Sequence, residues 1–160
     1  MQIEKHKAIY WGEFRGSSFG DAGKYSYLFG STIVYHARDH IFFENPLMAS
    51  GQIIHEWSSH WNYQRDRSQP ALPLLKRGQS YSLTRKMTTS PAHGVFLKLV
   101  FYNRYGEEVG QLIERGEQLD FTYPKEAYSY RVQLLSAGLE SFDFYYLEIS
   151  ERKADKQEEN

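Results

Sequence analysis

The alternation of apolar and polar residues with a period of two constrains this chain more than any other feature. Between residues 128 and 134, Tyr130, Val132 and Leu134 alternate with Arg131 and Gln133. Neighbouring side chains of a β-strand point to opposite faces of the sheet, so this pattern predicts a strand with one buried face. A helix would need apolar residues three and four apart, and no stretch of useful length shows that spacing. The chain is therefore expected to bury its apolar residues by stacking sheets.

Similar patterns recur along the chain, and aromatic residues, which strands favour, make up 16% of it. Residues 94–102 are apolar on both faces except at Lys98, which is typical of a central strand, and Asn103 to Gly106 supply turn residues for a hairpin. Strands are predicted at residues 25–30, 31–35, 41–43, 52–58, 79–88, 94–102, 107–113, 119–123, 128–134 and 142–149. So many short strands, separated by Gly, Pro and Asn turns, indicate an all-β fold that is an antiparallel sandwich or barrel. Of these we predict an antiparallel β-sandwich of the jelly-roll type.

Length and charge set further bounds. The 160 residues suit one domain, expected at 1–149, and the charged residues 150–160 are expected to form a disordered tail. The net charge of −1 gives no basic footprint for nucleic acid, and the absence of cysteine excludes disulfides. No apolar run reaches the length of about 20 residues that spans a bilayer, and no signal-peptide pattern opens the chain. These features favour a cytoplasmic location, with at most peripheral membrane association.

The candidate binding segment lies within residues 44–78, where large aromatics mix with charges and prolines interrupt the strand pattern. Trp, Tyr and Arg carry much of the energy of protein interfaces, so this composition favours a partner- or substrate-binding surface. For Trp57, at the end of an alternating strand, burial in the core is an open alternative. The candidate binding residues are Trp57, Trp61, Asn62, Tyr63, Arg65, Asp66 and Arg67.

Catalytic and metal sites are weaker hypotheses. Residues 16–20 match G-x-S-x-G around Ser18, but no helical pattern follows, and the motif works only at a strand-to-helix turn. His36 and His40 have the spacing of a helical zinc site, yet they lie in a strand and loop region without a third ligand. We therefore predict no catalytic residues, no metal ligands and no cofactor.

Four blocks of the sequence resemble a known family, at residues 43–51 (FENPLMASG), 61–81 (WNYQRDRSQPALPLLKRGQSY), 101–110 (FYNRYGEEVG) and 121–138 (FTYPKEAYSYRVQLLSAG). They are similar to the third of the accessory secretory proteins in the accessory Sec system of Gram-positive bacteria. The resemblance covers the chain from about Ile9 to Ile149, and it implies a fold like that of a carbohydrate-binding module.

The resemblance also implies a function. The chain would be a non-catalytic, cytoplasmic subunit that supports the export of serine-rich-repeat glycoprotein adhesins, acting in scaffolding or substrate recognition. Its implied partners are the two larger accessory secretory proteins, the accessory Sec ATPase and the adhesin, whose glycans are an open alternative as the contact. Recruitment to the membrane face of the translocon also stays open. The competing hypotheses are a stand-alone glycan-binding module and an esterase or metalloenzyme.

Overall fold

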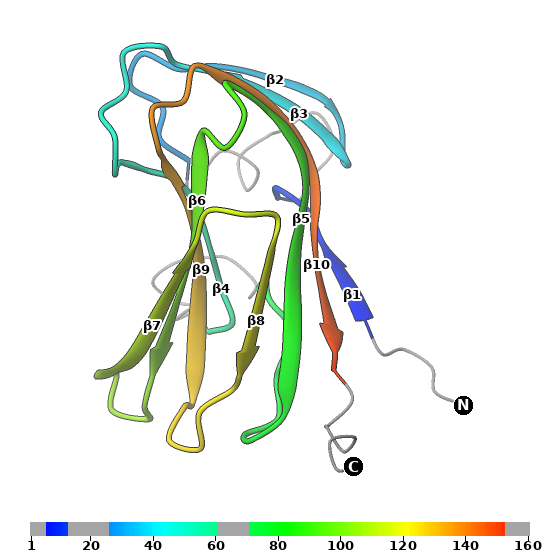
Figure 1. Ribbon diagram of the computed structural model, residues 1–160, viewed down its shortest axis with the longest axis vertical. Coiled ribbons are helices and arrows are strands. Elements are labelled where there is room, and N and C mark those ends of the chain that lie inside the picture. The colour runs from blue at the N-terminus through cyan, green and yellow to red at the C-terminus, as the bar shows by residue number, and fades with distance from the viewer. Residues whose placement is uncertain (1–5, 13–25, 61–70, 153–160) are drawn as a thin grey trace.

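The computed structural model describes residues 6–12, 26–60 and 71–152, which form ten β-strands and no helix (Figure 1). The strands are β1 (His6–Ile9), β2 (Thr32–Ala37), β3 (His40–Glu44), β4 (Ile53–Ser58), β5 (Ser80–Ser90), β6 (Val95–Tyr102), β7 (Glu108–Glu114), β8 (Gln118–Thr122), β9 (Ser129–Ser136) and β10 (Ser141–Glu151). The predicted all-β fold is confirmed. Among the described residues there is consequently no helix long and apolar enough to cross a membrane.

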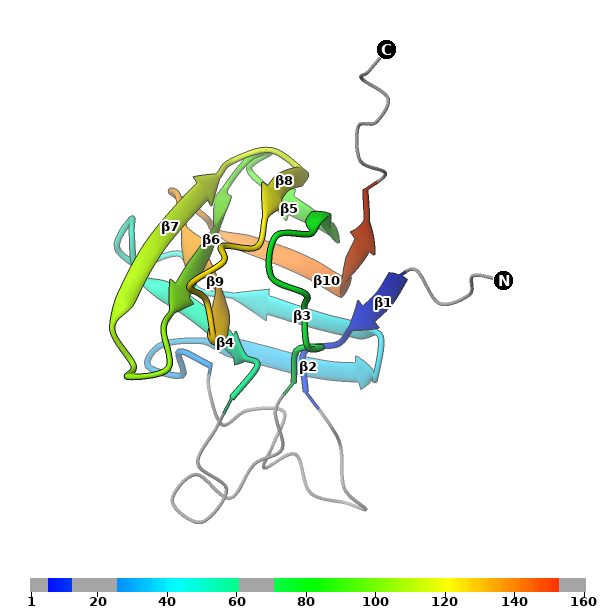
Figure 2. The ribbon, with the colours of Figure 1, turned by 90° about the horizontal axis from the view of Figure 1, so that it is seen from below.

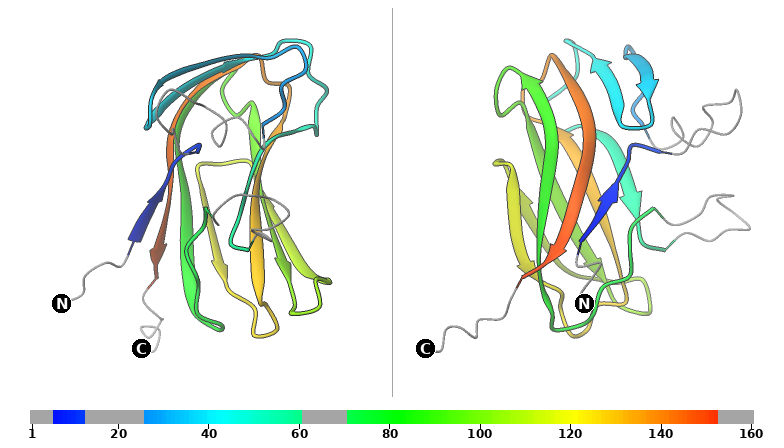
Figure 3. Two further views of the ribbon diagram at one scale, coloured as in Figure 1. Left: turned by 180° about the vertical axis from the view of Figure 1, so that it is seen from behind. Right: turned by 90° about the vertical axis from the view of Figure 1, so that its right-hand side faces the viewer.

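The strands form two antiparallel sheets that face each other (Figure 3, left). One sheet has the order β2-β3-β10-β5-β8, with β1 also paired to β10, and the other has the order β4-β9-β6-β7. The first sheet bends, so that β2 and β3 lie over one end of the sandwich (Figures 1 and 3). The predicted antiparallel sandwich is confirmed, and β6 is the central strand expected at residues 94–102.

Strand β10 holds the six-stranded sheet together because its two halves have different partners. Residues Ser141 to Phe144 pair with β3, and Leu147 to Ser150 pair with β1, while β5 runs along the opposite edge. The pairing with β5 shifts register between Phe144 and Tyr146. An irregularity of this kind bends a strand and increases its twist. It lies where β10 passes from one partner to the other.

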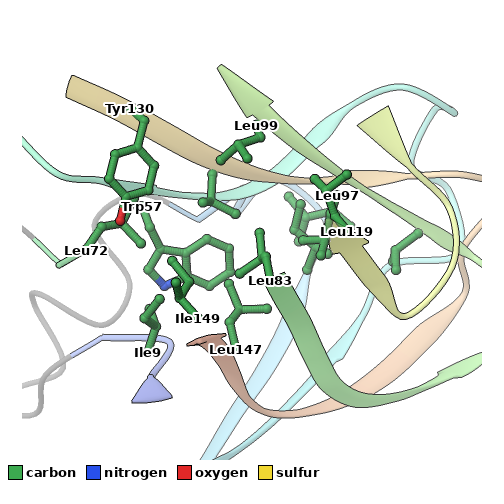
Figure 4. Close-up of a cluster of buried hydrophobic side chains, with 14 of the residues drawn as sticks. Ile9, Trp57, Leu72, Leu83, Leu97, Leu99, Leu119, Tyr130, Leu147 and Ile149 are labelled. Atoms are coloured by element: carbon green, nitrogen blue, oxygen red, sulfur yellow. The ribbon is translucent and has the colours of Figure 1, made fainter. Parts of the chain in front are cut away.

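The core fills the space between the sheets with side chains from both of them (Figure 4). Leu83 and Leu147 come from the six-stranded sheet, and Leu97 and Leu99 come from β6 of the four-stranded sheet. Burying a side chain of this size contributes about 1.5–3 kcal/mol. The period-two alternation therefore encodes the core, as predicted.

The predicted hairpin between β6 and β7 is also present. The Asn103 side-chain oxygen accepts hydrogen bonds from the backbone amides of Tyr105 (2.9 Å) and Glu107 (3.0 Å). Gly106 follows with a φ of 81°, a conformation that glycine adopts at little cost. An Asn that bonds to the backbone ahead of it and a Gly at positive φ together explain why the chain turns here.

Three local expectations were wrong. Residues 25–30 do not form a strand within the described part: Ser26 makes a single bridge to His55, and the chain then turns at Gly30, whose φ is 75°. Strand β10 continues through Glu151, beyond the predicted start of the tail at 150, because Ser150 and Glu151 pair with β5. In β4 a register shift buries both Ile54 and His55, so strict alternation fails there. Residues 153–160 of the predicted tail lie outside the described part.

Candidate recognition surface

Trp57 belongs to the core. Its side chain is 1% exposed, and its indole nitrogen donates a hydrogen bond of 2.8 Å to the carbonyl oxygen of Tyr10. Its ring packs edge-on against Trp11, with 5.9 Å between ring centroids, and stacks on Phe144 at 5.7 Å. The alternative left open by the sequence is therefore decided for burial, because β4 turns this position inward (Figure 4). As a surface contact for a partner, Trp57 was a wrong prediction.

The other candidate binding residues, Trp61, Asn62, Tyr63, Arg65, Asp66 and Arg67, lie outside the described residues and stay predictions. The residues at the two ends of that segment are described. The carbonyl oxygen of Ser58 accepts hydrogen bonds from the backbone amides of Ala71 (2.9 Å) and Leu72 (3.2 Å). Leu72 is buried in the core. The chain that leaves the end of β4 therefore returns to the same place.

A cluster of polar side chains lies beside the Ser58 end of β4, on the outer face of the four-stranded sheet. We call this cluster the polar patch; it consists of Glu56, Lys98, Tyr102, Arg131 and Gln133. These side chains occupy the positions between the core residues of β4, β6 and β9, so they point away from the core. The register of the three strands places Glu56, Gln133 and Lys98 side by side in one row.

Hydrogen bonds join three members of the patch, Glu56, Arg131 and Gln133. The Glu56 carboxylate accepts a bond of 2.9 Å from the Gln133 amide and a bond of 3.3 Å from the Arg131 guanidinium. The guanidinium carbon of Arg131 also lies 5.5 Å from the centre of the Tyr102 ring, within the range of a cation–π contact. Burial raises the pKa of the Tyr102 hydroxyl; Arg131 opposes this shift, and Glu56 and Glu108 add to it. The phenol therefore stays neutral and can donate a hydrogen bond.

Backbone contacts connect the patch to the ends of the candidate segment. Ser58, at the end of β4, pairs with Arg131 of β9. The Tyr128 amide donates to the Tyr102 carbonyl at 2.7 Å, and the Tyr128 ring lies edge-on to His60 with centroids 6.1 Å apart. His60, the last described residue before the candidate residues 61–67, thus lies near the polar patch. The sequence showed the alternating Arg131 and Gln133, but it gave no sign that Glu56 lies beside them.

The structure also places a serine against a histidine. The Ser26 hydroxyl lies 2.6 Å from Nδ1 of His55. This arrangement resembles that of a catalytic nucleophile and its general base. A general base needs a pKa near the working pH, whereas burial lowers the pKa of His55 to about 3, with a backbone hydrogen bond to Trp11 opposing the shift. The imidazole also stacks on the Trp11 ring at 4.0 Å. This pair therefore suits a buried structural network rather than catalysis.

Metal-binding chemistry finds no support in the described part of the chain. Across residues 6–12, 26–60 and 71–152, no group of three His, Cys, Asp or Glu side chains is arranged to hold an ion. His36 and His40 do lie together, with ring centroids 4.5 Å apart, in the hairpin of β2 and β3. Nε2 of His40 lies 2.9 Å from the carboxylate of Asp143, which occupies that nitrogen. The G-x-S-x-G match around Ser18 lies outside the described residues.

Comparison with known proteins identifies the family. A family model described as Accessory Sec secretory system ASP3 matches residues 26–151. The chain belongs to this family. It is 62% identical to the accessory Sec system protein ASP3 of Streptococcus gordonii over 152 residues, which cover 94% of this chain and 96% of that protein. The family resemblance seen in the sequence is confirmed.

Solved structures agree with this assignment. The chain is similar to one in the crystal structure of accessory secretory proteins 1, 2 and 3 of Streptococcus pneumoniae, with a TM-score of 0.81 and 39% identity, over 96% of this chain and 99% of that one. A second match is the Glycosylation Associate Protein (Gap123) complex of Streptococcus agalactiae, with a TM-score of 0.80 and 36% identity, over 92% of this chain and 45% of that one. Family 22 carbohydrate-binding modules match at TM-scores of only 0.46 and 0.45, and these carry no argument about sugar binding.

Proposed function

We propose that this ASP3-family chain is a non-catalytic subunit of a cytoplasmic complex with the two larger accessory secretory proteins. That complex supports the export of serine-rich-repeat glycoprotein adhesins through the accessory Sec ATPase, with at most peripheral contact at the membrane face of the translocon. The observation that carries the proposal is the match, over nearly the full length of both chains, to a protein crystallised with accessory secretory proteins 1 and 2.

Within the complex, the chain contributes to recognition through the polar patch and through residues 61–67, which follow His60 in the sequence. A serine-rich polypeptide presents many hydroxyl groups, which both donate and accept hydrogen bonds. The patch offers a carboxylate at Glu56, an amide at Gln133 and a phenol at Tyr102, all partly exposed on the outer face of the four-stranded sheet. The hydrogen bond that the Gln133 amide donates to Glu56 orients both side chains before binding, which lowers the entropy cost of recognition.

Co-purification from the native cell tests membership of the complex. A tagged copy of the full chain should bring down both larger accessory secretory proteins in constant proportion. The adhesin should join them when its export is blocked. Recovery of the tagged chain alone, under conditions that preserve other cytoplasmic complexes, would contradict the proposal.

A matched pair of substitutions tests the recognition role. Gln133 and Gln118 both lie on strands and donate an amide hydrogen bond to a carboxylate, to Glu56 at 2.9 Å and to Asp120 at 2.8 Å. Gln133→Ala should weaken adhesin capture by the assembled complex, whereas Gln118→Ala, on the other sheet, should not. Equal capture by both variants, with unchanged folding, would show that the patch is not a contact for the adhesin.

A stand-alone glycan-binding module is the second candidate, and the polar patch is the observation that favours it. An aromatic ring beside carboxylate and amide groups can meet both the C–H face and the hydroxyls of a sugar. Titration of the isolated chain with N-acetylglucosamine-bearing adhesin and with unmodified serine-rich peptide separates the two candidates. Binding of the sugar without the accessory proteins supports the module, and binding of the bare peptide supports a chaperone-like subunit.

A further inference from the structure

Strand β7 forms an open edge of the four-stranded sheet. It pairs with β6 on one side, and no strand of the described residues lies on its other side (Figure 2). The opposite edge of the same sheet is different, because chain segment 26–27 lies against β4. There Ser26 bridges His55, and the Tyr27 amide donates a bond of 2.7 Å to the Ile54 carbonyl. Within the described residues, the backbone groups on the outer side of β7 thus lack the cover that β4 has.

Three side chains of β7 are apolar and exposed, and they lie on both faces of the sheet. Ile113, which pairs with Lys98 on the outer face, is 54% exposed, and Val109 is 36% exposed. Leu112 pairs with the core residue Leu99 and therefore faces the other sheet, yet it is 38% exposed. The facing sheet ends at the short strand β8, and more than a third of the Leu112 side chain stays exposed beyond it.

Open apolar edges are usually protected in stable monomers by Lys, Pro or a bulge in the strand, or by a covering segment. The sequence of β7, EVGQLIE, contains neither Lys nor Pro, and its register with β6 shifts only at the hairpin end, between Phe101 and Tyr102. Its charged residues are Glu108 and Glu114, one at each end. An edge with this composition is suited to accept a strand from another chain, as in β-augmentation.

The two glutamates indicate what kind of strand fits. When β7 pairs antiparallel with a second copy of itself over its full length, Glu108 of each copy lies opposite Glu114 of the other. Like charges directly opposite each other destabilise a strand pair. A strand of a different protein, apolar at its centre and carrying Lys or Arg at its ends, would instead place opposite charges against both glutamates.

We propose that β7 is a docking strand that takes up such an extended, basic-ended strand of a different protein and so extends the four-stranded sheet. The inference rests on the proposed function, in which the two larger accessory secretory proteins are the partners. One strand from one of these proteins would pair with the β7 backbone and cover Val109, Leu112 and Ile113. Pairing along the backbone supplies affinity, and the alternate side chains supply specificity.

A matched set of variants tests this proposal. The double variant Val109→Lys with Ile113→Lys places two positive charges on β7. The control, Val34→Lys, places one positive charge on β2, another edge strand, where Val34 is 40% exposed. With the full chain and the purified accessory secretory proteins, the β7 variant should bind more weakly by about tenfold or more. Val34→Lys should bind as the wild type does.

The outcomes separate the two proposals. If the wild-type chain binds neither accessory protein, the proposed function fails. If the wild type binds and the β7 variant binds equally well, the docking strand is overturned while the proposed function stands. Should the β7 variant fail to fold, hydrogen exchange of the wild-type chain decides: the β7 amides should gain protection in the complex, and unchanged exchange overturns the proposal. A wild-type dimer that the β7 variant abolishes would also overturn it, in favour of a second copy.

Discussion

Ser26 donates a hydrogen bond of 2.6 Å to Nδ1 of His55, although 29 positions separate the two residues in the chain. Nε2 of the same imidazole donates to the Trp11 carbonyl at 2.7 Å, and the Trp11 indole donates to the Ser26 hydroxyl at 3.1 Å. Because a carbonyl can only accept, the proton of the neutral ring sits on Nε2, and Nδ1 accepts from the hydroxyl. The three bonds close a circuit that holds Trp11 and Ser26 against β4.

This circuit predicts a pH-dependent stability. Burial lowers the pKa of His55 to about 3, below the ordinary histidine value of 6.5. Between pH 6.5 and about 3, His55 binds a proton in the unfolded chain but stays neutral in the folded chain. The free energy of unfolding should therefore fall as the pH drops from 6.5 toward 3, by up to about 1.4 kcal/mol per pH unit. Urea denaturation at a series of pH values from about 7.5 to 4.5 measures this slope.

Two variants assign the slope to its residue. His55→Gln keeps a neutral hydrogen-bonding side chain but cannot take up the proton, so the contribution of this position to the slope should disappear. His36→Gln replaces an exposed histidine and serves as the control for the loss of an imidazole elsewhere in the chain. The same slope in His55→Gln as in the wild type would show that other groups cause it.

Trp57 and Trp61 are expected to differ in what they stabilise. Trp57→Ala removes a fully buried ring and should lower the free energy of unfolding by about 3–5 kcal/mol. Trp61→Ala should leave thermal stability nearly unchanged and weaken assembly or adhesin binding, as predicted from the sequence. Denaturation of each variant and co-purification with the accessory proteins measure the two effects. A large stability loss in Trp61→Ala would instead place that ring in the core.

Asn45 predicts a second stability effect, because it is buried and joins two turns. Its amide group donates 3.0 Å bonds to the Phe29 carbonyl and the Ser31 hydroxyl, and its side-chain oxygen accepts from the Leu47 amide at 3.2 Å. Asn45→Ala leaves these groups without their partner and should cost about 1–3 kcal/mol. Asn103→Ala, in the solvent-exposed hairpin turn, should cost less because water replaces the lost bonds. Thermal denaturation compares the two, and equal losses would contradict this explanation.

Gly94 is expected to resist substitution. A Cβ atom at this position would lie 2.9 Å from the Pro91 carbonyl oxygen and 3.2 Å from a methyl group of Leu139, so the backbone would have to move. Gly94→Ala should therefore destabilise the fold by about 1–3 kcal/mol, as overpacking does. Gly110→Ala, whose new Cβ would lie 3.6 Å from the Phe101 ring, is the matched control and should be tolerated. Denaturation midpoints of the two variants test the difference.

The sequence predicted the sandwich well because alternation is a local signal that directly reports which face of a strand is buried. It also predicted the turn at Asn103 to Gly106, since both residues act within the turn itself. It failed at residues 25–30, where the apolar residues Leu28 and Phe29 resemble a strand but lie exposed in a turn. That turn depends on Asn45, a contact across 16 positions that no local pattern reveals.

The candidate site shows the same limit. From the sequence alone, Trp57 could lie in the core or on the surface, because an aromatic residue at the end of a strand is compatible with both. The pairing and packing of β4 in the structure decide between the two. The polar patch was not predicted, since Glu56 and Gln133 lie 77 positions apart and meet only through the pairing of β4 with β9. Composition alone, in contrast, was enough to nominate residues 61–67, which stay a prediction.

The double hydrogen bond to the Ser58 carbonyl has a consequence for engineering this connection. Because Ala71 and Leu72 both donate to that one oxygen, the two described ends of the connection are joined at the sandwich. Connections closed at their base tolerate changes in length and sequence at small entropic cost. Replacing the segment between residues 60 and 71 by one of a different length should therefore change the free energy of unfolding only slightly.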